Sequence, residues 1–318
     1  MATRLYPVEL HVGTAVPSGA RPSLGRDMTL LKVPADTALT VSMDTLVADI
    51  HFFRDSQPQD IGYKALAANL SDLAAMGAHP QAALLSLTNA GCDQAWLASF
   101  TGAVAKLADR FGVALLAEEI TEGPLSITIQ VYGYVSAADA LRRDTAREGD
   151  LVFVTGTLGD AGLALAVARG RPTRTLSDRD YLLARLARPE PRVAAGMALR
   201  GVASAAIDIS DGLLADLGHV LESSRVGASI DVTRLPLSEA VERNLDKVCA
   251  RDLALSAGDD YELCFTVPQE RLDALRKVEP TLRCLITRIG KIETKPGIRC
   301  FDEAGALSPH HHGYRHFE

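Results

Sequence analysis

Two segments in the second half of the chain each combine a short apolar stretch, a turn rich in glycine or aspartate, and a helical pattern. The first is REGDLVFVTGTLGDAGLALAVARG at 147–170, and the second is AAIDISDGLLADLGHVLESSRVG at 205–227. A strand, a tight turn and a helix in succession open an α/β unit. These segments therefore restrict the second half to a sheet layered with helices.

The first half of the chain also alternates strand-like and helix-like segments. Pro58 suits a first helical turn, and Gly77 followed by Pro80 ends that helical pattern. We expect strands at 39–52, 81–90, 113–120 and 126–135, and helices at 58–77 and 93–111. The sequence pattern changes near residue 140. The chain is thus predicted to form two domains of α+β and α/β class, residues 1–140 and 141–318.

Composition bears on the possible partners. Lys and Arg total 33 against 40 Asp and Glu, which gives a net charge of −7, and no basic run stands out. Nucleic acid is therefore not an expected partner. A chain of this sign that binds phosphates needs local basic side chains or bound cations, and this favours a metal.

Compartment is indicated by hydropathy and by the cysteines. No apolar stretch approaches the roughly 18 residues that span a bilayer. The opening MATRLYPVELHVG lacks the layout of a signal peptide. The five cysteines are dispersed without a CxxC pair, which is typical of reduced thiols. We expect a cytoplasmic protein with no membrane association.

The glycine-rich stretch GTLGDAG at 156–162 leaves two interpretations open. Its backbone amides could hold an anion, although no Walker-type GxxxxGK[ST] is present. It could equally be a tight turn that packs a helix onto a sheet.

Carboxylates stand at positions where structure alone would not require them. They interrupt apolar segments or end predicted elements, and they are Asp27, Asp44, Asp72, Glu118, Glu119, Asp208 and Asp211. A buried carboxylate is costly unless it is paired or bound to metal. Singly, Asp44 could be a turn residue, Asp72 a partner of Lys64, and Asp211 a helix cap. Together, without a Cys or His pattern, they favour Mg²⁺ shared with substrate phosphates.

Five long motifs carry a resemblance to a known family. They are DTLVADIHF, DIGYKALAANLSDLAAMGAHP, GDLVFVTGTLGDAGLAL, IDISDGLLADLGH and SAGDDYELCFTVP. In this order they resemble the thiamine-monophosphate kinase family, a branch of the superfamily that includes aminoimidazole ribonucleotide synthetase. The likeness runs from about residue 24 to the end of the chain.

The resemblance implies a fold and a reaction. The N-terminal αβ domain would pair its strands across a homodimer into a barrel, and nucleotide would bind between it and the C-terminal α/β domain. ATP would transfer its γ-phosphate directly to thiamine monophosphate. Several Mg²⁺ ions would screen the two anionic reactants. The acceptor phosphate is already ionised, so no general base is nominated and no catalytic residue is expected beyond metal-assisted positioning.

The same resemblance assigns roles to individual residues. Metal binding falls on Asp27, Ser42, Met43, Asp44, Asp72, Glu119, Asp208 and Asp211. Nucleotide binding falls on Glu118, Glu119, Arg143 and Ser210. Substrate binding falls on His51, Asp259 and Tyr314. Met43 replaces the family's usual Thr, so its metal contact would run through the backbone. His51 could instead be a packed histidine, and Arg143 a solvated charge.

Departures from the family pattern concentrate in two places. Arg26 replaces the first Asp of a Gly-Asp-Asp, and 117–120 read AEEI where the family has Gly-Gly-Asp-Thr. Glu122 stands where an Arg is common. One added negative charge about 4 Å from a phosphate costs on the order of 4 kcal/mol before screening, so Glu118 and Glu122 should weaken ATP binding.

These departures keep other functions in view. The chain could be a slow or diverged kinase, or a binding protein that kept the fold but lost Mg·ATP. Another ATP-dependent enzyme of the superfamily is a further alternative, but residues 1–23 lack the glycine-rich or Cys/Lys-bearing segments of those branches.

Overall fold

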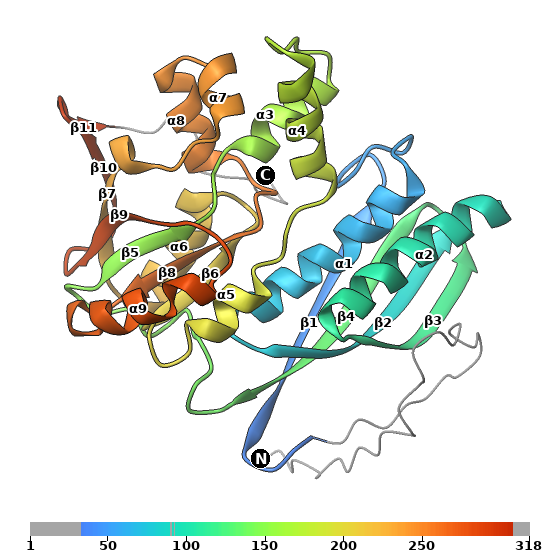
Figure 1. Ribbon diagram of the computed structural model, residues 1–318, viewed down its shortest axis with the longest axis horizontal. Helices are drawn as coiled ribbons and strands as arrows, with labels where there is room; N and C mark the ends of the chain where they lie inside the picture. Colours follow the sequence, from blue (N-terminus) through green and yellow to red (C-terminus); the bar gives the residue numbers. More distant parts are fainter. Residues whose placement is uncertain (1–32, 90, 92, 308–318) are drawn as a thin grey trace. The chain divides into compact units, whose positions relative to one another are not determined.

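The chain divides into two compact units, each built on its own β-sheet (Figure 1). The computed structural model describes residues 33–307 apart from 90 and 92, and not the side chain of Ala117. The first unit holds Met1–Asn69 and Pro80–Ala138, and the second holds Leu70–His79 and Asp139–Glu318.

The first unit contains a four-stranded sheet in the order β1-β4-β2-β3. Its strands are β1 (Thr37–Val47), β2 (His79–Asn89), β3 (Ala114–Glu122) and β4 (Ser126–Ser136). β1 and β4 are antiparallel along their whole length, from Thr37 opposite Ser136 to Val47 opposite Ser126. β2 and β3 are parallel and are connected through α2, as a crossover between parallel strands requires.

Two helices, α1 (Pro58–Ala75) and α2 (Gln94–Phe111), lie over one face of this sheet (Figure 1). Asp93 caps α2 by accepting from the Trp96 amide, and Gly112 ends it with φ 68°. The buried residues of α2 recur at helical spacing, at Phe100, Val104, Leu107 and Ala108. The sequence therefore gives α2 one apolar side, which packs towards the sheet and α1.

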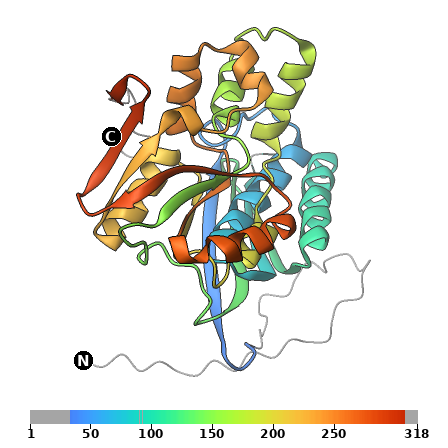
Figure 2. The ribbon, with the colours of Figure 1, turned by 60° about the vertical axis from the view of Figure 1, so that its left-hand side comes forward.

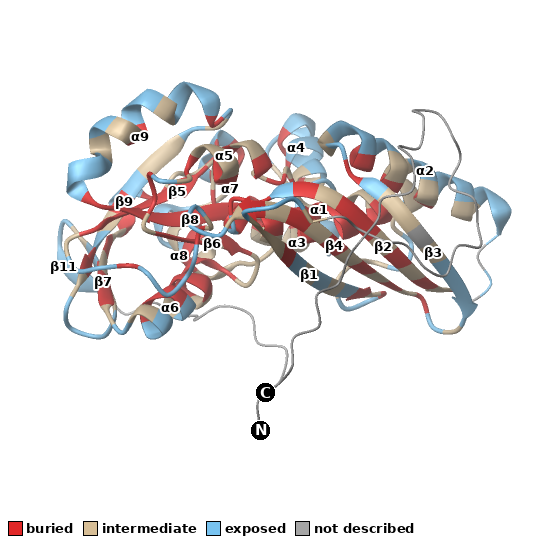
Figure 3. Ribbon diagram, turned by 90° about the horizontal axis from the view of Figure 1, so that it is seen from below, coloured by how far each residue is buried: buried red, intermediate tan, exposed pale blue. Residues whose placement is uncertain are grey.

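The two faces of the first sheet differ in burial. Residues of β4 alternate strictly between buried and partly exposed positions, as Figure 3 shows by colour. The helices cover the face that carries Ile127 and Ile129. On the opposite face of β1, Val41 is 47% exposed and Met43 is 60% exposed. This open face is apolar at its centre.

The second unit contains a seven-stranded sheet in the order β11-β10-β7-β9-β5-β8-β6. The strands are β5 (Leu151–Thr155), β6 (Ala205–Ile209), β7 (Gly227–Asp231), β8 (Glu262–Val267), β9 (Ile286–Glu293), β10 (Gly297–Asp302) and β11 (Gly305–Leu307). Figure 2 shows β5, in green, beside β9, in red. Only β10 and β7 pair in parallel among the pairs of known direction, so the sheet is mixed.

The core of the second unit lies on both faces of this sheet. Every residue of β5 and β8 is buried, as expected of strands covered on both sides. Its helices are α3 (Asp160–Ala168), α4 (Leu176–Ala187), α5 (Val193–Ala198), α6 (Leu213–Ser224), α7 (Glu239–Asn244), α8 (Lys247–Ser256) and α9 (Leu272–Val278). The apolar side of α6 packs on the sheet through Leu213, Leu217 and Val220. A second cluster joins α3, α4, α7 and α8 around Leu163 and Leu182.

The sequence predicted most of these elements within a few residues. Both expected helices of the first half and its four strands are present, and so are the two strand–turn–helix segments, as β5–α3 and β6–α6. The strand expected to reach residue 52 ends at Val47 because Ile50 and His51 turn back to hydrogen-bond the Val47 carbonyl. A barrel closed across a dimer is not shown. Among the described residues, no helix has the length and hydropathy of a membrane span.

An ion pair between the buried Asp178 of α4 and the half-exposed Arg243 of α7 gives the stability of the second unit a predictable pH dependence. The Asp178 carboxylate is 2.6 Å from Arg243 Nη2 and also accepts from Asn244, and these partners lower its pKa to about 2. The charged form is stabilised on folding, so this contribution is present above about pH 4 and is lost as pH falls towards 2. We expect Asp178→Asn to lower the free energy of unfolding at pH 6, and the difference from wild type to shrink by pH 3.

Urea denaturation at several pH values measures this difference. Asp273→Asn serves as the control, because the side chain of Asp273 is 84% exposed and its ion pair with Arg276 should contribute little. A difference between Asp178→Asn and wild type that stays constant from pH 6 to pH 3 would contradict the assignment.

Candidate active site at one edge of the second sheet

Three turns meet at one edge of the second sheet because β8 runs antiparallel to both of its neighbours. β5 pairs with β8 on one side and β6 pairs with it on the other. The ends of β5 and β6 and the beginning of β8 therefore lie at the same edge. These are the glycine turn (156–160), the acidic turn (210–212) and the segment before β8 (257–261), here called the β8 loop.

The acidic turn is wrapped around one buried carboxylate. Oδ2 of Asp216 accepts from the backbone amides of Ser210, Asp211 and Gly212 at 3.0, 3.0 and 3.1 Å. Burial raises the pKa of Asp216 to about 7, against the effect of these hydrogen bonds. Asp211 does not cap α6, since Gly212 occupies the N-cap without a side-chain hydrogen bond. The capping interpretation of Asp211 is therefore wrong, and Asp216 satisfies these amides instead.

The β8 loop is fixed against the acidic turn. The Asp259 amide donates to the Ser210 carbonyl at 2.9 Å, and the Tyr261 amide donates to the Ile209 carbonyl at 2.8 Å. A Cβ at Gly258 would lie 2.3 Å from the Ser210 carbonyl oxygen, so only glycine fits there. Asp259 and Tyr261 have φ of 68° and 50°, which costs of order 1–3 kcal/mol each and needs support from the surroundings.

The amides of the glycine turn are used by the protein itself. Gly159 N donates to Oδ2 of Asp260 at 2.7 Å, and Ala161 N donates to Oδ1 at 3.2 Å. Asp260 is buried, and burial raises its pKa to about 8. Of the two interpretations left open by the sequence, the structure supports the packing turn. The hydrogen-bond acceptor at the beginning of α3 is a side chain of the β8 loop.

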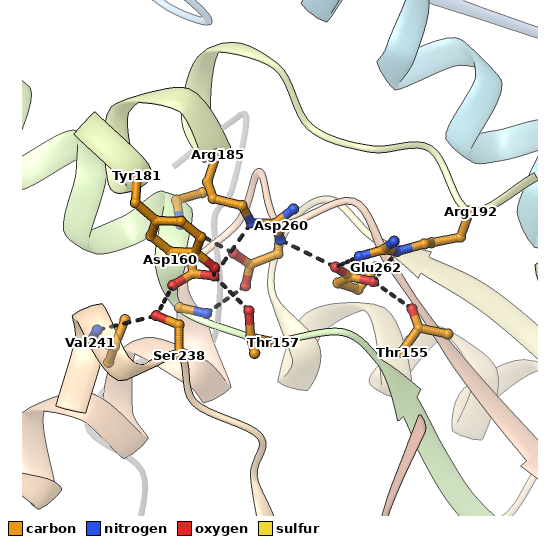
Figure 4. A network of polar contacts seen from close by, with 12 residues as sticks. Thr155, Thr157, Asp160, Tyr181, Arg185, Arg192, Ser238, Val241, Asp260 and Glu262 are labelled. Carbon is orange, nitrogen blue, oxygen red and sulfur yellow. Dashed lines mark hydrogen bonds and ion pairs between the residues drawn. The ribbon is translucent and has the colours of Figure 1, made fainter. Parts of the chain in front are cut away.

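A network of buried charges lies beside the glycine turn (Figure 4). Arg185 bridges two carboxylates, with Nε 3.3 Å from Asp160 Oδ2 and Nη2 3.2 Å from Glu262 Oε1. Arg192 makes a two-pronged contact with Glu262. Asp160 also accepts from the hydroxyls of Thr157, Tyr181 and Ser238, and Glu262 from that of Thr155. Asp160 and Glu262 are thereby both hydrogen-bonded and paired with arginine.

Asp208 near the end of β6 is held by a buried hydroxyl. Ser71 Oγ of α1 donates to Asp208 Oδ2 at 2.8 Å, and both residues are buried. Asp72 is the next residue of α1 and belongs to the same unit. The structure therefore brings together Asp208, Ser210, Asp211 and Asp259 at one edge of the sheet, with Asp72 adjacent in sequence to the partner of Asp208.

The first unit separates its predicted ligands by face. Asp44 lies within β1, not in a turn, and its amide donates to Asn69 Oδ1 at 3.2 Å. Ser42 and Asp44 alternate with Met43, so they share the helix-covered face while Met43 points to the open face. Any metal contact of Met43 would thus have to use its backbone.

Glu118 and Glu119 point to opposite faces of the same sheet. The parallel register pairs Glu118 with the buried Leu85, and Glu119 with Ser86. Oε1 of Glu118 is buried without a hydrogen-bond partner among the described residues, and burial raises the pKa of this carboxyl. Glu119 is exposed on the face opposite Asp44, so the structure does not bring these two predicted ligands to one face.

His51 and Arg143 occupy contrasting places. The His51 ring accepts from the Val47 amide through Nδ1 at 3.0 Å, which fixes its orientation in the turn after β1. The Arg143 carbonyl accepts from Ser224 at the C-terminal end of α6, whereas Ser210 precedes its N-terminal end. Twelve helical residues span about 18 Å, so Arg143 and Ser210 lie at opposite ends of α6.

Some predicted residues cannot be placed, and others were missed. Asp27 and Tyr314 lie outside the described residues. Sequence reasoning missed Asp216, Asp260 and Glu262. Glu262 stands between Tyr261 and Leu263, which is the same signal, an acid between apolar neighbours, that singled out Asp44.

The donor atoms at the sheet edge fit magnesium. Asp208, Ser210 and Asp211 offer carboxylate and hydroxyl oxygens, the ligands that Mg²⁺ prefers. Within the described ranges, no three or more His, Cys, Asp or Glu side chains form a group that could hold a metal ion. Protein sites commonly hold Mg²⁺ with one or two carboxylates plus substrate phosphates, so these oxygens fit a metal that the substrates help to bind.

Comparison with protein families covers most of the chain. Residues 25–135 match the N-terminal domain of AIR synthase related proteins, and residues 147–303 match their C-terminal domain. The thiamine-monophosphate kinase of Escherichia coli K12 is 44% identical over 296 residues, which is 92% of this chain and 91% of that protein.

Solved structures agree with the sequence comparison. The thiamine-monophosphate kinase of Stenotrophomonas maltophilia K279a superposes with a TM-score of 0.82 at 43% identity, over 89% of this chain and 90% of that one. AaThiL complexed with AMPPCP and TMP has a TM-score of 0.78 at 29% identity, over 90% and 89%. The fold is thus the mixed two-domain architecture of the AIR synthase type, and the chain belongs to the thiamine-monophosphate kinase family.

Proposed function

We propose that this thiamine-phosphate kinase transfers the γ-phosphate of ATP directly to the phosphate of thiamine monophosphate, which yields thiamine diphosphate. The 2.9 Å bond from the Asp259 amide to the Ser210 carbonyl carries the proposal. It joins the loop assigned to the substrate phosphate with the turn assigned to nucleotide and metal. The bound AMPPCP and TMP of AaThiL support the same pair of substrates.

The residues assigned to binding act by position rather than by proton transfer. In the second unit, Asp72, Asp208 and Asp211 would hold Mg²⁺, with Ser210 on the nucleotide and Asp259 on the substrate. In the first unit, Ser42, Asp44 and the Met43 backbone would hold metal, and His51 would contact the substrate. Asp27, Glu119, Arg143 and Tyr314 are assigned by family likeness alone. Strand register turns Glu119 away from the face of Asp44, and Arg143 lies at the other end of α6 from Ser210.

Bound Mg²⁺ would neutralise the phosphates of both reactants and the charge that develops during transfer. The chain's own contribution is rigidity. Asp216 fixes the acidic turn through three amides, and Gly258 lets the β8 loop approach that turn closely. A fixed in-line geometry is most of what phosphoryl transfer requires from a protein.

A coupled assay of ATP consumption with thiamine monophosphate and Mg²⁺ tests the proposed function. We expect turnover that depends on thiamine monophosphate, and we expect Asp208→Asn to lower kcat/KM by about 100-fold or more because it removes a metal-binding carboxylate. Asp273→Asn, an exposed acid of α9, should retain wild-type activity. Turnover with a different phosphorylated metabolite and none with thiamine monophosphate would reject the substrate.

We expect the negative charge of Glu118 to weaken nucleotide binding. Glu118→Gln removes one negative charge and should tighten binding of Mg·AMPPCP several-fold, since repulsion of the triphosphate is relieved. Isothermal titration calorimetry measures the change, and Glu270→Gln, at an exposed acid in the turn after β8, is the control for net charge. Wild-type protein that binds thiamine monophosphate but no Mg·AMPPCP, even after Glu118→Gln, would favour the alternative of a non-catalytic binding protein.

We further propose that the chain forms a homodimer in the cytoplasm through the open face of its first sheet. Val41 and Met43 expose apolar side chains at the centre of this face, and burial of such a face stabilises association. Residues Tyr132 and Gln130 stand opposite them on β4.

Val41→Glu places a charge on the open face and should shift the protein from dimer to monomer. Sedimentation velocity at micromolar concentration measures the shift. Val248→Glu is the control, because Val248 is an exposed apolar residue of α8, outside the first sheet. A wild-type monomer, or a dimer that Val41→Glu leaves intact, would exclude this interface.

A further inference from the structure

The β8 loop presents Asp259 in the left-handed backbone region, which residues other than glycine adopt uncommonly. Asp259 and Tyr261 both have positive φ, and Asp260 lies between them. The Asp259 and Tyr261 amides of the loop donate to the carbonyls of Ser210 and Ile209. Two hydrogen bonds at one side of the loop leave its other side to be secured.

Asp260 secures that other side. Its two carboxylate oxygens accept from Gly159 N and Ala161 N, so the loop is attached to the first turn of α3. These two amides lie at the beginning of α3, a helix of nine residues, where backbone N–H groups have no partner within the helix. The backbone of Gly159 packs closely against α8, because a Cβ at Gly159 would lie 3.0 Å from the Ala254 amide nitrogen. The carboxylate therefore joins the glycine turn and the β8 loop.

The charges around Asp260 keep this attachment in place. Two buried acids lie beside this attachment. Asp160 follows Gly159 in the glycine turn, and Glu262 directly follows the β8 loop as the first residue of β8 (Figure 4). Arg185 spans these two acids and balances part of their charge. Without Arg185, Asp160 would lose its arginine partner, and the two segments would lose the side chain that joins them.

We propose that Asp260 is a positioning residue for the substrate: it attaches the β8 loop to the glycine turn, with Arg185 as its support, and so holds Asp259 at the acidic turn. The inference rests on the proposed function only for the role of Asp259. The attachment itself is a property of the fold and has its own measurement.

Asp260→Asn tests the attachment with little change in volume. The NH2 group of Asn takes the place of one carboxyl oxygen and cannot accept, so one of the two amides at the beginning of α3 loses its partner. We expect hydrogen exchange at the Asp259 and Tyr261 amides to rise about tenfold or more. The KM for thiamine monophosphate should rise about tenfold, while the KM for ATP changes less than about twofold.

Arg185→Lys provides a second variant that keeps the charge. A lysine cannot span Asp160 and Glu262 as the guanidinium does, so we expect the same pattern at about threefold. Asp178→Asn is the matched control: it removes another buried acid that pairs with arginine, and Asp178 is on the same helix as Arg185, α4. It should lower the melting temperature without changing either KM or the exchange of the two amides.

The outcomes separate the inference from the function on which it rests. If Asp260→Asn behaves like Asp178→Asn in both exchange and KM, Asp260 is merely structural and the inference is wrong. If Asp260→Asn does not fold, Arg185→Lys decides in the same way. Faster exchange in a protein whose wild type does not phosphorylate thiamine monophosphate would uphold the attachment and reject the proposed function.

Discussion

The second unit depends on two buried acidic side chains, Asp160 and Glu262, each of which forms an ion pair with arginine. Asp160 and Glu262 have no contact with bulk water, and Arg185 reaches both. A buried charge that loses its partner is more costly than most losses of apolar contact. The arrangement therefore permits few alternatives in how α4, the glycine turn and the beginning of β8 come together. Rigidity at the sheet edge follows from this electrostatic requirement.

Periodic sequence patterns were enough to predict most of the elements. The alternation in β4 and the helical spacing in α2 are local signals, so the chain reveals them without tertiary knowledge. The order of strands was not predictable in this way. β8 lies between β5 and β6 although long stretches of chain separate the three strands, and only packing decides that order.

The candidate site was predictable where residues act through their type and not where they act through a partner. Asp208 and Asp211 stand out because acids at the end of a strand need an explanation. Asp260 was not predicted because its role is to accept hydrogen bonds from the amides of Gly159 and Ala161, about a hundred residues earlier in the chain. Glu119 shows the opposite limit. Its residue type suited a ligand, but strand register turns it away from the face of Asp44.

The first sheet has two unequal margins. β1 forms one outer strand, and β3, with Glu118, Glu119 and Glu122, forms the other. If another chain paired with the edge strand β3, acidic side chains would be brought close together and would repel. Natural proteins use charged edge strands in this way to prevent edge-to-edge pairing. One margin of this sheet is thus protected against open-ended polymerisation. Association through the first sheet should consequently stop at a closed assembly instead of continuing into fibres.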